Sequence, residues 1–206
     1  MKLLLHTCCA PCSIQCIAAL AEEEILPDLL WYNPNIHPYT EYRSRRDSFI
    51  LLAEREKLNL VMEDGYGLRP FIKAVENGIN GAMHRCARHR CATCYRLRLE
   101  KAASLAAEKG YEAFSTTLLI SPYQDHGLLK ETGEELAALY RVNFLYRDFR
   151  PRFRKGREQA REAGFYMQKY CGCIYSEEER YLEKSVGSIA GINPSGREGP
   201  SGREGK

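Results

Sequence analysis

The chain has 206 residues, of which 44% are hydrophobic and 28% charged, an ordinary composition for a soluble globular protein with one well-cored domain. Its start, MKLLLHTCCAPC, holds too short an apolar run for a secretory signal, and no later run approaches the roughly 20 apolar residues of a membrane span. A net charge of +3 is too small to indicate a polyanionic partner by itself. We therefore expect a cytoplasmic protein that is not inserted in a membrane.

Short apolar runs alternate with helical segments along most of the chain. Runs rich in Leu, Val, Thr and Phe predict strands at residues 2–7, 29–32, 60–62, 113–119 and 144–146. Helical periodicity predicts helices at residues 13–24, 41–58, 71–76, 94–109, 131–141, 154–163 and 176–182. Because parallel strands need crossover connections, this alternation predicts a three-layer α/β domain with a mostly parallel sheet.

The periodic part of the sequence ends before the chain does. From residue 187 the apolar periodicity is lost, and the chain closes on SGREGP followed by SGREGK. Such a composition cannot bury enough apolar surface to become ordered. We expect a single α/β domain over residues 1–186 and a disordered Gly-, Ser- and Arg-rich tail over residues 187–206.

Three segments that follow predicted strands carry distinctive residues: CCAPC, NPNIHP and SPYQDH. In an open α/β sheet the functional crevice lies beyond the carboxyl ends of the strands. We therefore expect the three segments to converge there. His37 and His126 lie in these segments, which makes them candidates for a ligand or an acid.

Seven of the nine cysteines form three tight groups far apart in the sequence: Cys8, Cys9 and Cys12; Cys91 and Cys94; Cys171 and Cys173. In a reducing cytosol so many cysteines indicate metal ligation or redox chemistry rather than structural disulfides. Four thiolates complete a zinc tetrahedron or a cubane cluster, so seven exceed both requirements. The surplus favours redox chemistry beyond one structural zinc.

The first two groups are expected at helix starts. The CCAPC cysteines should occupy the first turn of a helix, and CATC, with Cys91 and Cys94, should stand at the start of the long helix predicted at residues 94–109. Free N–H groups and the helix dipole favour thiolate at both places. CATC alone is also compatible with a thioredoxin-like redox pair or half a zinc site.

The third group, in YCGC, flanks a glycine that permits a tight bend. Cys171 and Cys173 can form a strained, readily reducible disulfide or offer sulfur to two neighbouring metals. Cys86 completes a ferredoxin-like Cx4CxxC spacing with CATC, but we discount it because Cys94 begins a predicted helix. Cys16, one turn after Cys12, is expected to fill the core.

Basic and aromatic residues alternate in RDFRPRFRKGREQAR, residues 147–161. Cations neutralise phosphates and aromatic faces stack on splayed bases, a combination typical of single-stranded RNA binding. A solvated basic surface remains the alternative.

Six segments together resemble the epoxyqueuosine reductase family of the QueH type. They are HTCCAPCS, NPNIHPYTEYRSR, CATCYRLRLEK, STTLLISPYQDH, DFRPRFRKG and QKYCGCIYSEEE, in this order over about residues 2–182. An ordered set of this length is far more specific than a single CxxC.

The resemblance implies a nucleotide-hydrolase-like sheet of the HUP type with a Cys-rich metal site at the C-terminal ends of the strands. It implies cobalamin-independent, two-electron reduction of the epoxide of epoxyqueuosine to queuosine, the last step of queuosine biosynthesis. The substrate would be the wobble base of tRNAs with GUN anticodons. The resemblance also implies a [4Fe-4S] cluster and, in some members, an additional mononuclear iron, so that residues 1–186 would be the catalytic domain of an iron–sulfur oxidoreductase.

By position, the resemblance assigns four cysteines to the [4Fe-4S] cluster: Cys8, Cys9, Cys91 and Cys94. It assigns Cys171 and Cys173 to a redox-active pair or to a second metal. Some relatives have an aspartate where this chain has Cys12, which suits a ligand of a second iron and leaves the role of Cys12 open.

The remaining candidates would handle protons and the nucleotide. The candidate proton donors follow the fourth predicted strand: Tyr123, Asp125 and His126. The candidate substrate-binding residues would contact phosphates or stack on a flipped base: Tyr32, Asn33, His37, Arg43, Arg150, Arg152 and Phe153. An external ferredoxin- or flavodoxin-like protein would supply the electrons.

Three other functions compete with this interpretation. A structural-zinc RNA-binding protein would also use four of the cysteines. A thiol-disulfide oxidoreductase could use CATC or CGC, but would not require the basic aromatic segment. An ATP-using tRNA-thiolating enzyme would need a glycine-rich loop where CCAPC stands.

Overall fold

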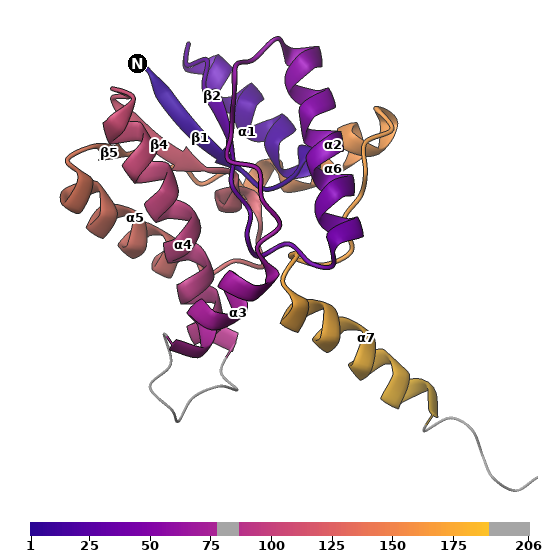
Figure 1. Cartoon of the computed structure of the whole chain (residues 1–206). Helices are drawn as coiled ribbons and strands as arrows, with labels where there is room; N and C mark the ends of the chain where they lie inside the picture. Colours follow the sequence, from indigo (N-terminus) through magenta and orange to yellow (C-terminus); the bar gives the residue numbers. More distant parts are fainter. Residues whose placement is uncertain (78–86, 190–206) are drawn as a thin grey trace, which may run out of the picture.

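Five parallel strands form the sheet of the computed structural model, which describes residues 1–77 and 87–189 (Figure 1). The strands are β1 (Leu3–Thr7), β2 (Asp28–Trp31), β3 (Leu60–Met62), β4 (Ala113–Thr116) and β5 (Asn143–Phe144). Their order across the sheet is β3-β2-β1-β4-β5, and all four neighbouring pairs are parallel. The prediction of an α/β fold with a mostly parallel sheet is confirmed.

Helices cover both faces of this sheet (Figure 1). They are α1 (Ala10–Glu22), α2 (Tyr39–Glu56), α3 (Leu68–Asn77), α4 (Ala87–Glu108), α5 (His126–Tyr140), α6 (Phe153–Glu162) and α7 (Ile174–Ile189), with 3-10 turns η1 (Thr117–Ile120) and η2 (Arg150–Arg152). Helix α1 packs against α2 and α6 on one face, and α4 packs against α5 on the other. The three expected layers are present.

Strand β1 lies at the centre of the sheet and of the core. Leu3, Leu4 and Leu5 have no exposed surface, because helices cover both faces of the strand. The chain winds from β1 toward β2 and β3 on one side, whereas β4 and β5 lie on the other. The carboxyl ends of β1 and β4 therefore flank the point at which an open α/β sheet forms its functional crevice.

Helix α1 begins at Ala10, three residues earlier than the sequence predicts. Pro11 does not delay the helix, because the first turn needs no N–H from that position. Cys9 is the N-cap residue. The early start brings CCAPC directly from the end of β1 into the first turn of α1, as expected for that group.

The prediction that Cys91 and Cys94 lie at the start of a long helix is wrong. Helix α4 already includes Ala87, so Cys91 lies at least on its second turn and Cys94 at least on its third. The run ARHRCATC contains no glycine or proline, and its Arg and Ala residues favour helix. The helix-start argument for thiolate therefore does not apply to these two residues.

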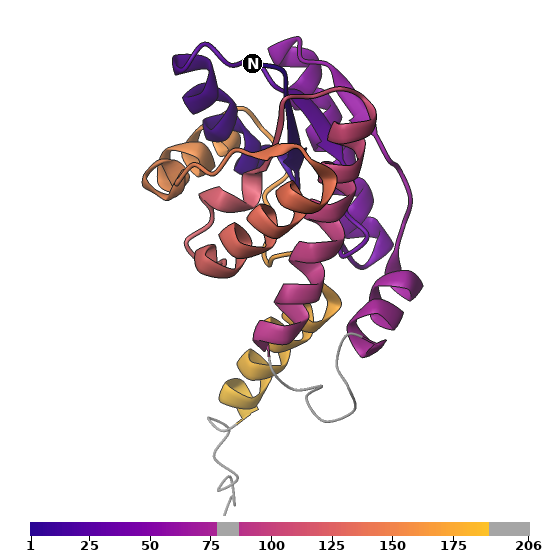
Figure 2. The same cartoon turned by 90° about the vertical axis from the view of Figure 1, so that its left-hand side faces the viewer.

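Helix α7 leaves the domain next to the N-terminal part of α4 (Figures 1 and 2). Arg90 of α4 forms an ion pair with Glu179 and lies over the ring of Tyr175, 5.0 Å from its centroid. Within residues 1–77 and 87–189, no helix is both long enough and apolar enough to cross a membrane. Cys86 and residues 190–206, which make up most of the predicted tail, lie outside the described residues.

The close approach of α5 to β5 gives a stability test. A Cβ at Gly133 would lie 2.4 Å from the ring of Phe144, whereas a Cβ at Gly127 in the same helix would meet only the Asp125 carboxylate at 3.5 Å. We expect Gly133→Ala to lower the free energy of unfolding by about 1–3 kcal/mol through overpacking. Gly127→Ala should leave it unchanged or raise it by up to about 1 kcal/mol. Urea unfolding measures both, and a Gly133→Ala protein as stable as the parent would contradict this packing.

Candidate metal centre

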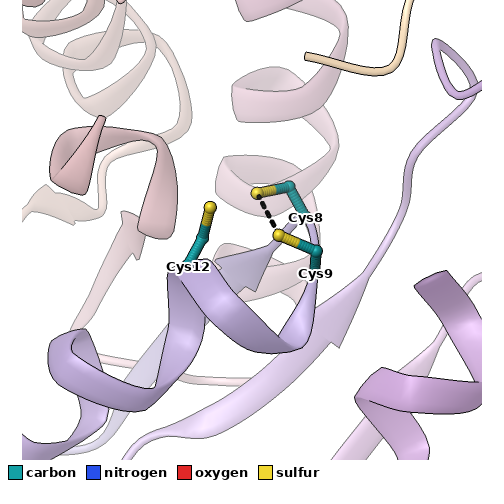
Figure 3. A group of neighbouring side chains, drawn as sticks. All are labelled: Cys8, Cys9 and Cys12. Carbon is teal, nitrogen blue, oxygen red and sulfur yellow. Dashed lines mark hydrogen bonds between the residues drawn. The ribbon is translucent and has the colours of Figure 1, made fainter. Parts of the chain in front are cut away.

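Three cysteine thiols meet where β1 runs into α1 (Figure 3). Cys8 follows the strand, Cys9 caps the helix and Cys12 lies one turn later. Their sulfur atoms all lie within 4.8 Å of one another, and the Sγ atoms of Cys8 and Cys9 are 3.7 Å apart. All three residues are buried, with at most 9% of their surface exposed. This spacing suits ligands of a metal and leaves the thiols unbridged.

Polar groups from two distant segments contact this trio. The Thr117 hydroxyl, just beyond β4, lies 3.6 Å from the Cys8 sulfur and accepts a hydrogen bond from the Cys8 backbone N–H at 3.3 Å. The Gln168 side-chain amide donates to the Cys12 sulfur at 3.4 Å. The end of β4 and the segment before CGC therefore both reach the first turn of α1.

The three thiols differ in their affinity for protons. Hydrogen bonds from Cys12 and Cys9 hold the pKa of the Cys8 thiol well below its ordinary value. The same contact with Cys8 raises the pKa of Cys12, and burial raises the pKa of Cys9. Of the three thiols, Cys8 is therefore the one whose surroundings favour the thiolate.

The second group lies on the inner side of α4. Cys94 is 8% exposed and packs in an apolar cluster with Phe71, Val75 and Cys173. Burial raises the pKa of Cys94 to about 12 and also raises that of Cys91. Burial therefore opposes ionisation of both thiols, whereas the helix-start effect that the sequence suggested would favour it.

The third group, Cys171-Gly172-Cys173, is held by a buried arginine. The guanidinium of Arg45, 1% exposed, donates to the carbonyls of Cys171 at 3.0 Å and Tyr170 at 2.9 Å, and its Nε pairs with Glu41 at 2.6 Å. Gly172 has φ +121°, and a Cβ there would lie 3.1 Å from that guanidinium. Glycine is therefore required at the bend.

The two CGC thiols also have opposite proton affinities. Cys171 is exposed, and hydrogen bonds from Cys173 and Ser176 lower its pKa to about 5. Cys173 is buried, and its contact with Cys171 raises its pKa. An exposed thiolate beside a buried thiol is the arrangement expected of a redox pair, and it equally suits ligation of a metal.

Electrostatic contacts connect the three groups. The positive charge of Arg98, on α4, acts on Cys94, Cys8 and Cys171. Cys173 in turn interacts with Cys94. In the described residues, the α1 trio is the only group of three or more cysteines whose sulfur atoms all lie within 4.8 Å of one another. The four cysteines of a cubane cluster each bind a different iron. Their sulfur atoms therefore need not all lie as close to one another as those of the trio do.

Of the predicted proton donors, the structure places none against a cysteine. Tyr123 is 84% exposed, Asp125 caps α5 through the Leu128 N–H at 3.0 Å, and His126 contacts the Ser121 carbonyl at 3.2 Å. The Asp125 backbone N–H donates to the Tyr95 hydroxyl at 3.2 Å. Because Tyr95 is the neighbour of Cys94 on α4, SPYQDH lies one side chain away from the second cysteine group.

The residues after β2 do reach the crevice. The Asn33 amide donates to the Thr7 carbonyl at 2.8 Å, and the Tyr32 carbonyl contacts His6 at 3.1 Å. His37 is fully buried, and its backbone N–H donates to the Gly172 carbonyl at 2.8 Å. Neither ring nitrogen of His37 has a hydrogen-bond partner in the described part of the chain, and burial lowers its pKa to about 4. His37 is thus a neutral ring next to the CGC segment.

The predicted phosphate contacts lie apart from the sulfur atoms or are already paired. Arg152 pairs with Glu22, the last residue of α1, and its Nη1 donates to the Gln15 side chain at 3.5 Å. Arg150 pairs with Asp148 at 2.6 Å. Phe153 contacts the Tyr123 ring with 5.9 Å between centroids, and Arg43 is exposed on α2.

Sequence reasoning missed the two arginines, Arg45 and Arg98, as well as Thr117 and Gln168. Arg98 follows Cys94 by one helical turn, so CATCYRLR holds a signal for it. Arg45 gives no such signal, because its partner Cys171 is 126 positions away. His6, near the end of β1, has both ring nitrogens engaged, by the Thr116 hydroxyl at 2.9 Å and by the Tyr32 carbonyl at 3.1 Å.

The Arg45–Glu41 pair should be essential to the CGC bend. We expect Glu41→Gln to lower the free energy of unfolding by about 3 kcal/mol, because it leaves a buried guanidinium without its counter-charge. Glu54→Gln, an exposed change in the same helix, should stay within about 0.5 kcal/mol of the parent. Equal stabilities of the two variants in urea unfolding would show that the pair contributes little.

Comparison with known proteins identifies the family. Residues 3–179 match the family described as "Epoxyqueuosine reductase QueH". A protein of that name from Dehalococcoides mccartyi is 38% identical over 87% of this chain and 94% of its own length. Its counterpart from Histophilus somni is 36% identical over 85% of this chain and 72% of its own length. The one from Thermotoga maritima is 33% identical over 86% of this chain and 91% of its own length. A solved structure titled as a predicted subunit of tRNA methyltransferase from Methanocaldococcus jannaschii covers 91% of this chain and 89% of its own, with 14% identity and a TM-score of 0.48, too weak a likeness to be informative. The match along nearly the whole domain, which contains all three cysteine groups, shows that the chain belongs to the QueH family of epoxyqueuosine reductases.

Proposed function

We propose that this chain reduces the epoxide of epoxyqueuosine to the alkene of queuosine, without cobalamin, at the wobble base of tRNAs with GUN anticodons. The observation that carries the proposal is the family match over residues 3–179. The three relatives compared with this chain all have the name epoxyqueuosine reductase, which states the reaction. The buried cysteine trio at the end of β1 supports it, because this reaction needs a source of electrons. The reaction would complete queuosine biosynthesis.

The chemistry sets clear requirements. The epoxide takes up two electrons and two protons, both C–O bonds break, a C=C bond forms, and the oxygen leaves as water. A [4Fe-4S] cluster, when bound, supplies electrons one at a time. The protein must hold that cluster, exclude bulk water and deliver two protons. An external ferredoxin- or flavodoxin-like protein is our proposed electron donor.

The donor set of the crevice fits such a cluster. We assign four thiols as its ligands: Cys8, Cys9, Cys91 and Cys94. The burial of Cys8, Cys9 and Cys94 supports this, as does the charge of Arg98, which acts on both Cys8 and Cys94. Cys12, beside Cys8 and Cys9, is free to bind a further iron.

The remaining side chains have proposed roles in redox, proton and nucleotide handling. Cys171 and Cys173 would exchange electrons as a dithiol pair or ligate the second iron. Tyr123, Asp125 and His126 remain our candidates for the protons, which would reach the crevice past Tyr95. The nucleotide would be bound by two sets of residues: Tyr32, Asn33 and His37 in the crevice, and Arg43, Arg150, Arg152 and Phe153 outside it.

One experiment tests the reaction and the ligand set together. The chain is reconstituted anaerobically with iron and sulfide, supplied with a chemical reductant and epoxyqueuosine-bearing tRNA, and the nucleosides are analysed by mass spectrometry. We expect queuosine to form without added cobalamin. Cys94→Ser should abolish both the bound iron and the product, because a hydroxyl is a poor substitute for a thiolate ligand.

Cys16→Ala is the matched control, because Cys16 is also fully buried in α1 but does not belong to the group of three sulfur atoms that lie within 4.8 Å of one another. It should keep iron and activity. A fully loaded parent protein that leaves the epoxide intact would refute the reaction. A protein that takes up one zinc and no iron would instead favour a structural-zinc RNA-binding protein.

A further inference from the structure

Arg98 is a buried cation without a carboxylate partner. It lies on α4 with 3% of its surface exposed, and none of the ion pairs found in residues 1–77 and 87–189 involves it. Arg45, the other fully buried arginine near the cysteines, is neutralised by Glu41. A guanidinium stays charged in proteins, so its burial is costly unless an anion lies beside it.

The side-chain group that Arg98 contacts is the sulfur of Cys94, which is an anion when it ligates a metal. The Nη2 of Arg98 donates to the Cys94 sulfur at 3.2 Å, and its Nε donates to the Cys94 carbonyl at 3.1 Å. A guanidinium has five N–H donors. Two of them are used on Cys94, and no side-chain carboxylate of the described residues pairs with Arg98. The cation therefore faces the cysteines.

We propose that Arg98 is a positioning residue that sets the reduction potential of the iron–sulfur centre. It does so by donating a hydrogen bond to the Cys94 thiolate and by placing an unneutralised positive charge beside the ligands of α1 and α4. This inference rests on the proposed function, because it requires that the centre contains iron and sulfide.

The direction of the effect follows from electrostatics. Reduction adds one negative charge to a cluster, and a fixed nearby cation stabilises the more negative state. Hydrogen bonds to the ligand sulfurs act in the same direction, and both are established determinants of cluster potential. Arg98 should therefore raise the potential, which makes the centre easier for its electron donor to reduce.

The test compares midpoint potentials by anaerobic redox titration, with the cluster followed by its visible absorbance and electron paramagnetic resonance. Arg98→Met removes charge and donors at similar side-chain length. We expect it to lower the equilibrium constant for one-electron reduction about ten-fold, a shift of about 59 mV to more negative potential. Arg98→Lys, which keeps the charge but loses the planar donor geometry, should fall between the parent and Arg98→Met.

Arg96→Met is the matched control. It makes the same chemical change two residues away on α4, where the side chain is 51% exposed and pairs with Glu135. Its potential should equal that of the parent. A shift as large as that of Arg98→Met would mean that any charge on α4 has this effect, and would overturn the assignment to Arg98.

The outcomes separate this inference from the proposed function. If the parent reduces epoxyqueuosine and Arg98→Met has the same potential, the role of Arg98 is refuted and the reaction stands. If the parent binds no iron, the proposed function fails and this inference fails with it. If circular dichroism shows that Arg98→Met does not fold, Arg98→Lys decides: a more negative potential supports the role, and an unchanged one refutes it.

Discussion

The buried cysteines of this protein depend on two buried arginines, Arg45 and Arg98, to favour the thiolate form inside the fold. Thiols inside a protein resist ionisation because thiolate loses its hydration there, and burial indeed raises the pKa values of Cys9, Cys91 and Cys94. Two arginines oppose this effect: the charge of Arg45 acts to lower the pKa of Cys9, and that of Arg98 acts to lower the pKa values of Cys91 and Cys94. Arg45 carries its own carboxylate partner and fixes the CGC backbone, whereas Arg98 directs its charge at the sulfur atoms.

The parallel sheet makes this arrangement possible. Strand β1 is central, so the residues that follow it emerge where the connections diverge toward β2 and β4. Cys8 and Cys9 stand at that point, and Thr117 approaches from the end of β4. Helix α4 contributes its cysteines from the side, and CGC closes the group just before α7. Segments more than 70 residues apart thereby come into contact, because Gln168 donates to the Cys12 sulfur and Cys94 packs with Cys173.

Local patterns in the sequence predicted the sheet, because alternating apolar runs and helical segments leave few topologies for parallel strands. They also placed CCAPC at the junction of β1 and α1. The start of α4 was misjudged, because the basic run before Cys91 was interpreted as a loop although Arg and Ala favour helix. Because the helix starts earlier, the stabilisation of thiolate expected at a helix start does not apply to Cys91 and Cys94.

Long-range partners could not be predicted in this way. Glu22 and Asp148 neutralise Arg152 and Arg150, so the count of basic residues overstated the charge available to phosphates. The clamp from Arg45 to Cys171 joins α2 to a segment far along the chain and has no local signature. Charge patterns along a sequence do not report which charges pair across the fold.

The central claim is that cysteines from β1–α1 and from α4 hold one shared iron centre. Mössbauer spectroscopy of the protein reconstituted with iron-57, compared with Cys8→Ser and Cys91→Ser, tests it most directly. We expect the parent to show the spectrum of a [4Fe-4S] cluster and both substitutions to disturb that same spectrum. If each substitution instead removes a different iron signal and leaves the other intact, the cysteines serve separate sites and the account is wrong.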